Sequence, residues 1–104
     1  MSLSNPSSAW SVTLPALYDK MTWQQRSQAR RQYAKLQHHE CYFCGGSLYQ
    51  DAPEEIKSLP VDWDLFPPNF LDYPQHLQHN HDTGYTEGVV HAYCNAVMWN
   101  YFRR

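Results

Sequence analysis

The sequence predicts a small single domain of the α+β class, in which one helix precedes a long loop, two strands and a second helix. Three observations support this order. Residues 22–37 are mostly good helix formers and contain no Gly or Pro, residues 71–90 form two runs that meet at a turn around Gly84, and residues 91–102 contain no helix breaker. The length of 104 residues fits one domain.

The composition indicates a globular chain with a weak core. Hydrophobic residues make up 42% and charged residues 17% of the sequence, which is typical of folded rather than disordered chains. Aromatic residues reach 15%, but aliphatic runs are scarce and there are seven prolines. Because such a core is short of Leu, Ile and Val, we expect something besides apolar packing to stabilise the fold.

Residues 1–21, rich in Ser and Pro, are expected to form an arm that wraps over the domain. No basic region precedes the apolar residues of this segment and Pro15 interrupts them, so we expect no signal peptide. No stretch is long enough to cross a membrane. We therefore expect a cytoplasmic protein without structural disulfides, which agrees with three cysteines that cannot all pair.

The helix predicted over residues 22–37 begins at Thr22, and Gln25 three residues later completes a capping box. One face is expected to pack against the domain. That face carries Trp23, Ala29, Tyr33 and Leu36.

Basic residues gather on the other side of this helix and at the end of the sequence, although the net charge is −2. They are Arg26, Arg30, Arg31, Lys35, Arg103 and Arg104. A local basic patch attracts a polyanion whatever the net charge. The alternative is an ordinary solvated helix face.

Residues 49–70 are expected to form a long insertion loop, because they contain four prolines and an acidic cluster that allow no more than one turn of regular structure. The segments that follow are a strand over 71–79 with Pro74 at an edge position, a turn over 80–85, a return strand over 86–90 and a helix over 91–102.

Two short motifs supply metal-binding side chains. Cys41 and Cys44 form CxxC, and His91 and Cys94 form HxxC. Together they make the Cys₃His set that tetrahedral structural zinc prefers, and they account for all three cysteines. The alternatives are two buried thiols beside an unrelated histidine, or a redox CxxC, which lacks a thioredoxin-like βαβ pattern here.

A second constellation is HLQHNHDTG, residues 76–84. In a strand His79 and His81 point the same way, and imidazoles can accept a proton from water or hold a cation or a phosphate. Asn95 directly follows Cys94, about 100° further around the helix, so that a metal on Cys94 leaves the Asn95 amide to face the hairpin. The alternative is a solvated polar hairpin.

HLQHNHDTG followed by EGVVHAYCNAVMWNY resembles the HNH nucleases of the His-Me finger group, closest to the phage recombination endonuclease VII branch. The resemblance covers residues 41–102 and has no gap over 71–102. It implies a zinc-braced ββα-metal domain over residues 22–104, with the ββα core at 71–102 and an N-terminal helix before it. The four residues Cys41, Cys44, His91 and Cys94 take the zinc-ligand places.

The same resemblance implies roles for the second constellation. His79 corresponds to the general base, Asn95 to the ligand of a catalytic Mg²⁺ or Mn²⁺, and His81 to an imidazole that contacts phosphate or metal. Gln78 stands where the family has Asp or His, and its neutral amide oxygen should bind a hard cation more weakly than a carboxylate.

The resemblance thus implies an endonuclease that hydrolyses DNA phosphodiester bonds by nicking or double-strand cleavage, in a bacterial or phage-infected cell. The basic residues would then hold DNA phosphates. Two alternatives remain. One is a catalytically inactive zinc module that binds DNA or a protein, which Gln78 favours. The other is a structural zinc domain within a larger assembly, which the acidic loop and the aromatic residues favour.

Overall fold

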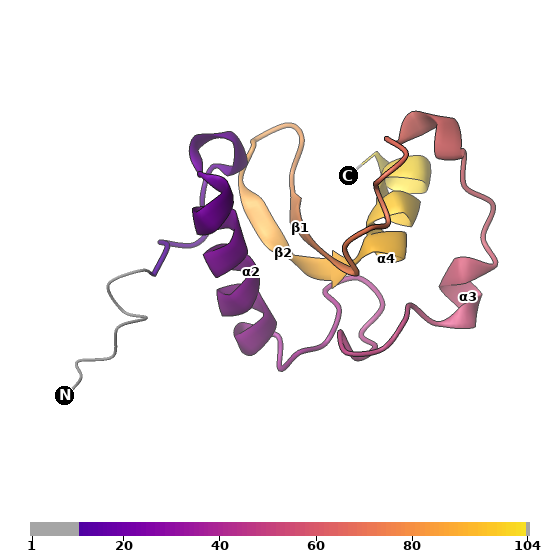
Figure 1. The fold of residues 1–104 in the computed structure, drawn as a ribbon, viewed down its shortest axis with the longest axis horizontal. Helices are drawn as coiled ribbons and strands as arrows, with labels where there is room; N and C mark the ends of the chain where they lie inside the picture. Colours follow the sequence, from indigo (N-terminus) through magenta and orange to yellow (C-terminus); the bar gives the residue numbers. More distant parts are fainter. Residues whose placement is uncertain (1–10, 104) are drawn as a thin grey trace.

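The computed structural model describes residues 11–103 and has the predicted α+β class (Figure 1). The first ten residues of the predicted arm and Arg104 lie outside the described residues. The main elements are the helix α2 (Trp23–Leu36), the strands β1 (Gln75–His79) and β2 (Thr86–His91), and the helix α4 (Ala92–Val97), which continues into the π-helical turn η3 (Met98–Phe102). Three short turns are η1 (Tyr18–Lys20), α3 (Glu54–Lys57) and η2 (Trp63–Leu65).

The start of α2 is as predicted. Thr22 Oγ1 accepts a hydrogen bond from the Gln25 backbone N–H at 3.2 Å, and Gln25 Oε1 accepts one from the Thr22 N–H at 2.8 Å. Both bonds satisfy donors that the first turn of a helix leaves unpaired.

The packing face of α2 is narrower than the sequence predicted. Ala29 and Ala34 are buried, whereas Trp23 and Leu36 are 74% and 69% exposed. The sheet has only two strands, and α2 contacts both of them. The two buried alanines lie within the helix, and the exposed Trp23 and Leu36 are its first and last residues.

The hairpin forms an antiparallel pair from Gln75↔His91 to His79↔Thr86, with a bulge between Gln78 and His79. The first strand begins at Gln75 rather than residue 71, because the residues before it make tight turns that end at Pro74. The second strand runs one residue further than predicted, to His91.

The turn is centred where predicted. Gly84 has φ +83°, which favours glycine, and its N–H donates to the Asn80 carbonyl at 2.7 Å. The Asn80 side chain accepts hydrogen bonds from the backbone N–H groups of Asp82 and Thr83.

Residues 11–21 do wrap over the domain. The Thr86 N–H donates to the Ala16 carbonyl at 2.8 Å, and the Ala16 N–H donates to Thr86 Oγ1 at 3.0 Å. The Tyr18 N–H donates to the Gly84 carbonyl at 2.9 Å. This segment therefore extends the hairpin at its turn end.

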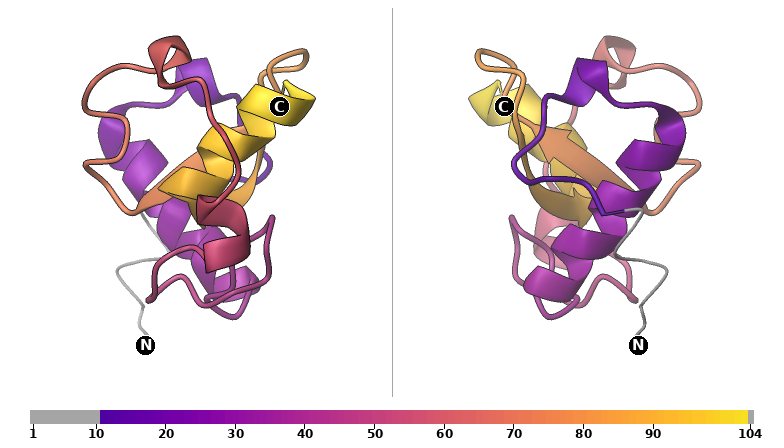
Figure 2. Two further views of the ribbon diagram at one scale, coloured as in Figure 1. Left: turned by 90° about the vertical axis from the view of Figure 1, so that its right-hand side faces the viewer. Right: turned by 90° about the vertical axis from the view of Figure 1, so that its left-hand side faces the viewer.

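A side chain joins the end of α2 to β2. Gln37 Oε1 accepts from the Val89 N–H, and Gln37 Nε2 donates to the Val89 carbonyl, each at 2.9 Å. A Cβ on Gly88 would lie 2.8 Å from both Gln37 Oε1 and Tyr42 Cγ, so the close approach requires glycine there. Figure 2 shows the hairpin lying between α2 and α4.

The core is as poor as the composition predicted. It is built around three alanines and two cysteines together with Leu48, Leu77, Val89, Val90 and Met98. The predicted helix over 91–102 is present as α4 and η3, but only its first part is buried: Tyr101 and Phe102 are 46% and 60% exposed. Among residues 11–103, no helix is long and apolar enough to cross a membrane.

The loop over residues 49–70 covers α4 and contains two short turns, one more than predicted. The ring of Trp63 meets that of Tyr93 edge-on at 5.2 Å, and the Asp62 N–H donates to Asn100 Oδ1 at 3.0 Å. The Tyr101 hydroxyl donates to the Pro60 carbonyl. The loop therefore packs along one side of the helix that carries Cys94.

Candidate metal centre and adjoining cleft

The four residues with metal-ligand spacing converge. The ligand atoms of Cys41, Cys44, His91 and Cys94 all lie within 4.8 Å of one another, close enough to hold one metal ion. His91 Nδ1 is 3.5 Å from Cys44 Sγ and 3.6 Å from Cys94 Sγ. A tetrahedral ion at ordinary zinc distances holds a nitrogen and a sulfur ligand roughly 3.6 Å apart, so this spacing fits such an ion.

Backbone hydrogen bonds shape the loop that carries the first two ligands. The Gly45 N–H donates to the Cys41 carbonyl at 2.9 Å, and the Gly46 N–H donates to Cys44 Sγ at 3.3 Å. Gly45 has φ +78°, a conformation that favours glycine. The CYFCGG turn therefore presents both sulfurs to the same point.

The second half of the cluster lies at the junction of β2 and α4. His91 ends the strand, and Cys94 lies in the first turn of the helix. His91 Nε2 is 2.8 Å from the Ser47 carbonyl. Because a carbonyl only accepts, Nε2 carries the proton, which leaves the lone pair of Nδ1 directed at the sulfurs.

The pKa values of the three thiols are shifted in different directions. A hydrogen bond with Cys94 lowers the pKa of Cys41 to about 4, and the same bond together with burial raises the pKa of Cys94. Burial also raises the pKa of Cys44. A bound cation would displace the remaining protons, because thiolates are the ligand form of cysteine.

A cleft of about 1020 Å³ is lined by residues of α2, β1 and α4, among them Asn95, which directly follows Cys94. Its polar lining includes all four residues that the resemblance placed in the reaction. The charged, amide and imidazole side chains are Arg26, Arg30, Gln75, His76, Gln78, His79, His81 and Asn95.

His79 is held by stacking. Its ring lies parallel to the Tyr18 ring, with centroids 4.2 Å apart and an interplanar angle of 15°. The centroid of the His81 ring lies 4.6 Å from that of the His79 ring and 4.6 Å from that of the Trp99 ring. Burial, with a smaller contribution from His81, lowers the pKa of His79, so its imidazole is neutral and able to accept a proton at neutral pH.

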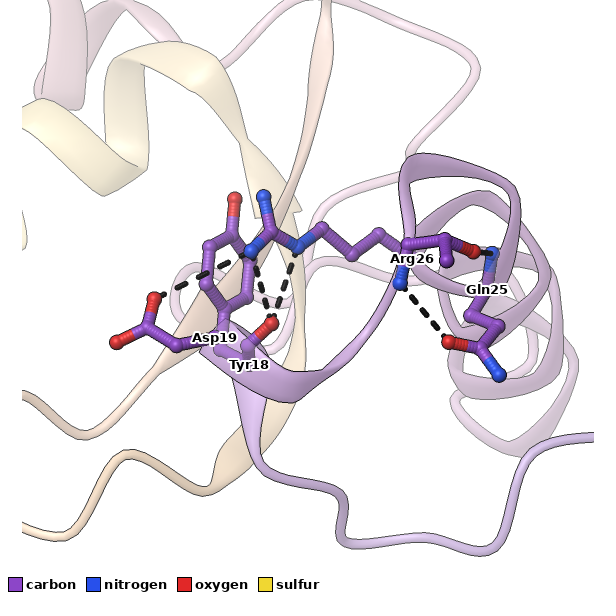
Figure 3. Close-up of polar contacts among 5 residues, drawn as sticks. Tyr18, Asp19, Gln25 and Arg26 are labelled. Carbon is purple, nitrogen blue, oxygen red and sulfur yellow. Dashed lines mark hydrogen bonds and ion pairs between the residues drawn. The ribbon is translucent and has the colours of Figure 1, made fainter.

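Arg26, predicted to contact a polyanion, makes several contacts within the chain (Figure 3). Its guanidinium lies 3.8 Å from the centre of the Tyr18 ring, donates twice to the Tyr18 carbonyl and is 4.0 Å from an Asp19 oxygen. Since only one group fits on each face of a ring at such distances, Arg26 and His79 occupy opposite faces of Tyr18. Arg26 therefore supports the position of His79.

The other predicted cationic residues within residues 11–103 differ in their surroundings. Arg30 lines the cleft, and among residues 11–103 its guanidinium makes no hydrogen bond or ion pair. Arg31 and Lys35 do not line it, and Arg31 donates to side chains one turn earlier in α2. Arg103 lies over the Trp99 ring at 5.5 Å.

Gln78 contains a buried acceptor without a donor. Its Nε2 donates to the His79 carbonyl at 2.9 Å, and its Oε1 has no hydrogen-bond partner within the described part of the chain, although the residue is only 2% exposed. The neighbouring carbonyl only accepts, so the amide cannot reverse and Oε1 must take the other side. An unpaired buried oxygen is costly, and a divalent cation would satisfy it.

Asn95 reaches the hairpin as predicted, but its partner is His76. Asn95 Nδ2 and His76 Nδ1 are 3.0 Å apart, and the Phe70 ring meets the His76 ring edge-on at 4.7 Å. Burial lowers the pKa of His76. Sequence analysis gave His76 no role, although its place two residues before Gln78 puts both side chains on the same face of β1.

Comparisons with protein-family models, with curated proteins and with solved structures find no match to this chain. The geometry of the site is therefore the basis for assigning a function.

The cluster predicts one metal ion per chain, with zinc as the ion expected from its sulfur-rich ligands. His91→Ala should lose the ion and several kcal/mol of unfolding free energy, a large part of the ~5–15 kcal/mol typical of a domain. His91→Cys is the matched control and should keep the ion, because zinc accepts Cys₄ as readily as Cys₃His. Elemental analysis and thermal unfolding measure both effects. Metal-free wild-type protein that unfolds at the same temperature would contradict the prediction.

Proposed function

We propose that this protein is a metal-dependent DNA endonuclease of the HNH type, in which a structural zinc on the Cys₃His cluster braces a ββα-metal core. The observation that carries the proposal is the convergence of Gln78, His79, His81 and Asn95 in one cleft beside that cluster. These residues come from β1, the hairpin turn and α4. Metal-dependent phosphodiester hydrolysis needs a proton acceptor and ligands for a cation, and the His79 imidazole and the two amides can fill these roles.

The cleft suits a nucleic acid. Arg30 lies on its α2 side and makes no hydrogen bond or ion pair with another of residues 11–103, so its positive charge favours a phosphate group. Trp23 and Tyr73, 74% and 73% exposed, are flat rings in the lining on which bases can stack. The combination of arginine and exposed aromatic rings distinguishes this cleft from a small-molecule pocket with an enclosed apolar lining.

In the proposed reaction His79 accepts a proton from a water molecule, whose oxygen forms a bond to the phosphorus. The bond from phosphorus to the 3′ oxygen breaks, and that oxygen takes a proton from solvent water. Tyr18 holds the His79 ring in place by stacking, and Arg26 supports Tyr18 from the other face. His81, whose ring centroid lies 4.6 Å from that of His79, would donate a hydrogen bond to a phosphate oxygen.

The residues present fit a catalytic Mg²⁺ or Mn²⁺. Gln78 Oε1 is a buried oxygen without a donor, and the Asn95 amide lies in the same cleft. When bound there, the cation supplies Lewis-acid stabilisation of charge that develops on the phosphate oxygens. Gln78 and Asn95 would hold it with neutral oxygens, so we expect weak binding that the substrate phosphate strengthens.

The second candidate is a catalytically inactive zinc module that binds DNA or a protein partner. Gln78 favours it, because the position lacks the carboxylate that binds a hard cation more strongly. Both candidate functions include the zinc cluster, and they differ in whether the cleft holds a catalytic cation and cuts DNA.

His79→Ala tests the proposed base. It should lower the rate of plasmid nicking with Mn²⁺ by about two orders of magnitude or more while zinc content and DNA affinity stay unchanged, since it removes a proton acceptor. The matched control is His38→Asn, which changes an exposed histidine at φ +55°, where Asn is tolerated. Equal nicking by His79→Ala and wild type, purified in the same way, would exclude His79 as the base.

The proposed contact between Arg30 and DNA is tested by comparing Arg30→Gln with the same substitution at the neighbouring Arg31. Arg30→Gln should weaken binding of all DNA sequences about equally and reduce the salt dependence by roughly one unit per lost phosphate contact. Arg31→Gln removes the same charge outside the cleft and should have a smaller effect. Fluorescence anisotropy at several salt concentrations measures both. If the salt dependence of DNA binding is the same for the two variants, DNA does not bind in the cleft beside Arg30.

Gln78→Asp separates the two candidates. In an endonuclease, the carboxylate should lower the Mn²⁺ concentration needed for half-maximal nicking and increase the thermal stabilisation that Mn²⁺ gives, because it adds a charged ligand. Without divalent ions, the same variant should be less stable than wild type, since its charge is buried and unpaired. If wild type and Gln78→Asp cut no DNA with Mg²⁺ or Mn²⁺, the inactive zinc module is the better assignment.

A further inference from the structure

A side-chain contact between α4 and β1 in the cleft includes a histidine that the proposed reaction does not use. His76 Nδ1 faces the Asn95 side-chain amide at 3.0 Å. Both side chains line the cleft with Gln78, whose Oε1 is buried without a hydrogen-bond donor. His76 and Asn95 are thus in direct contact, and Gln78 offers a third atom able to donate a lone pair to the same cleft.

The 3.0 Å separation matches a shared cation as well as a hydrogen bond. Adjacent ligands of an octahedral ion at about 2.1 Å lie roughly 3.0 Å apart. Rotation of the Asn95 amide by 180° exchanges its nitrogen and oxygen at the same position. The Asn95 oxygen would then lie at cis-ligand distance from His76 Nδ1 without movement of either chain segment.

The neighbours of His76 also favour a fixed ligand. The ring of Phe70 meets the imidazole edge-on at 4.7 Å, which restricts its rotation. His76 and Gln78 are two residues apart in β1, before the bulge, so they share a face of the strand. Asn95 is held opposite them because the adjacent Cys94 belongs to the Cys₃His cluster.

We propose that His76 is a third protein ligand of the divalent cation, through Nδ1, beside Gln78 and Asn95. The inference rests on the proposed function, since the ion is the one assigned there to the two amides. An imidazole in this position compensates for the carboxylate that Gln78 lacks. It also sets the choice of metal, because imidazole nitrogen is a better ligand for transition-metal ions than for Mg²⁺.

The test is direct binding of Mn²⁺ to zinc-loaded protein without DNA, measured from the free Mn²⁺ signal in electron paramagnetic resonance, with Mg²⁺ as competitor. His76→Ala should reduce the Mn²⁺ affinity at least about tenfold, the lower limit for loss of even an outer partner of a metal site. His38→Asn is the matched control and should bind as wild type. Zinc content and the circular dichroism spectrum establish that each variant is folded.

His76→Asp distinguishes a ligand from a residue that only positions Asn95. A carboxylate at this place should restore binding and make Mg²⁺ a stronger competitor than in wild type, because oxygen ligands suit Mg²⁺. A mere hydrogen-bond partner would not change the preference between metals. An unchanged Mn²⁺ affinity in His76→Ala, an unchanged metal preference in His76→Asp, or no Mn²⁺ binding by wild type would each overturn the inference.

Binding and nicking measurements keep this inference separate from the proposed function. Wild type that binds Mn²⁺ through His76 but cuts no DNA would support the ligand and contradict the endonuclease. Wild type that cuts DNA while His76→Ala binds Mn²⁺ normally would contradict the ligand and leave the endonuclease standing.

Discussion

The convergence of Cys41, Cys44, His91 and Cys94 is the constraint on which the rest of this structure depends. It joins the CYFCGG turn after α2 to the junction of β2 and α4. His91 ends the strand and Cys94 lies one turn into the helix, so the cluster sets the direction in which α4 leaves the hairpin. Asn95 follows directly and is therefore aimed at β1 by the same constraint.

Polar side chains carry much of the packing that aliphatic residues carry in other small domains. Gln37 pairs with both backbone groups of the fully buried Val89, and the Tyr33 hydroxyl lies 2.9 Å from Thr86 Oγ1. Such directional contacts leave little tolerance for displacement, because a buried donor or acceptor that loses its partner costs more than a shifted methyl group. A chain poor in Leu, Ile and Val can thereby keep α2 in one place on a two-stranded sheet.

Some residues that line the cleft also stabilise the fold. Tyr18 belongs to the segment that extends the hairpin, and its ring lies between Arg26 and His79. The same stack therefore links the segment before α2, α2 itself and the strand that carries the proposed base. Gln78 differs from these residues: among residues 11–103 no donor pairs with its buried Oε1, which is a cost to the fold.

The features that depend on neighbouring residues could be predicted from the sequence: the capping box at Thr22, the turn at Gly84 and the ligand spacing of the two half-sites. Local hydrogen bonds and backbone preferences decide these, and both can be inferred from spacing along the chain. Only the tertiary structure decided which side chains meet across segments. It exposed Trp23, engaged Arg26 with Tyr18 and paired Asn95 with His76, because each outcome depends on how two distant elements are placed in space.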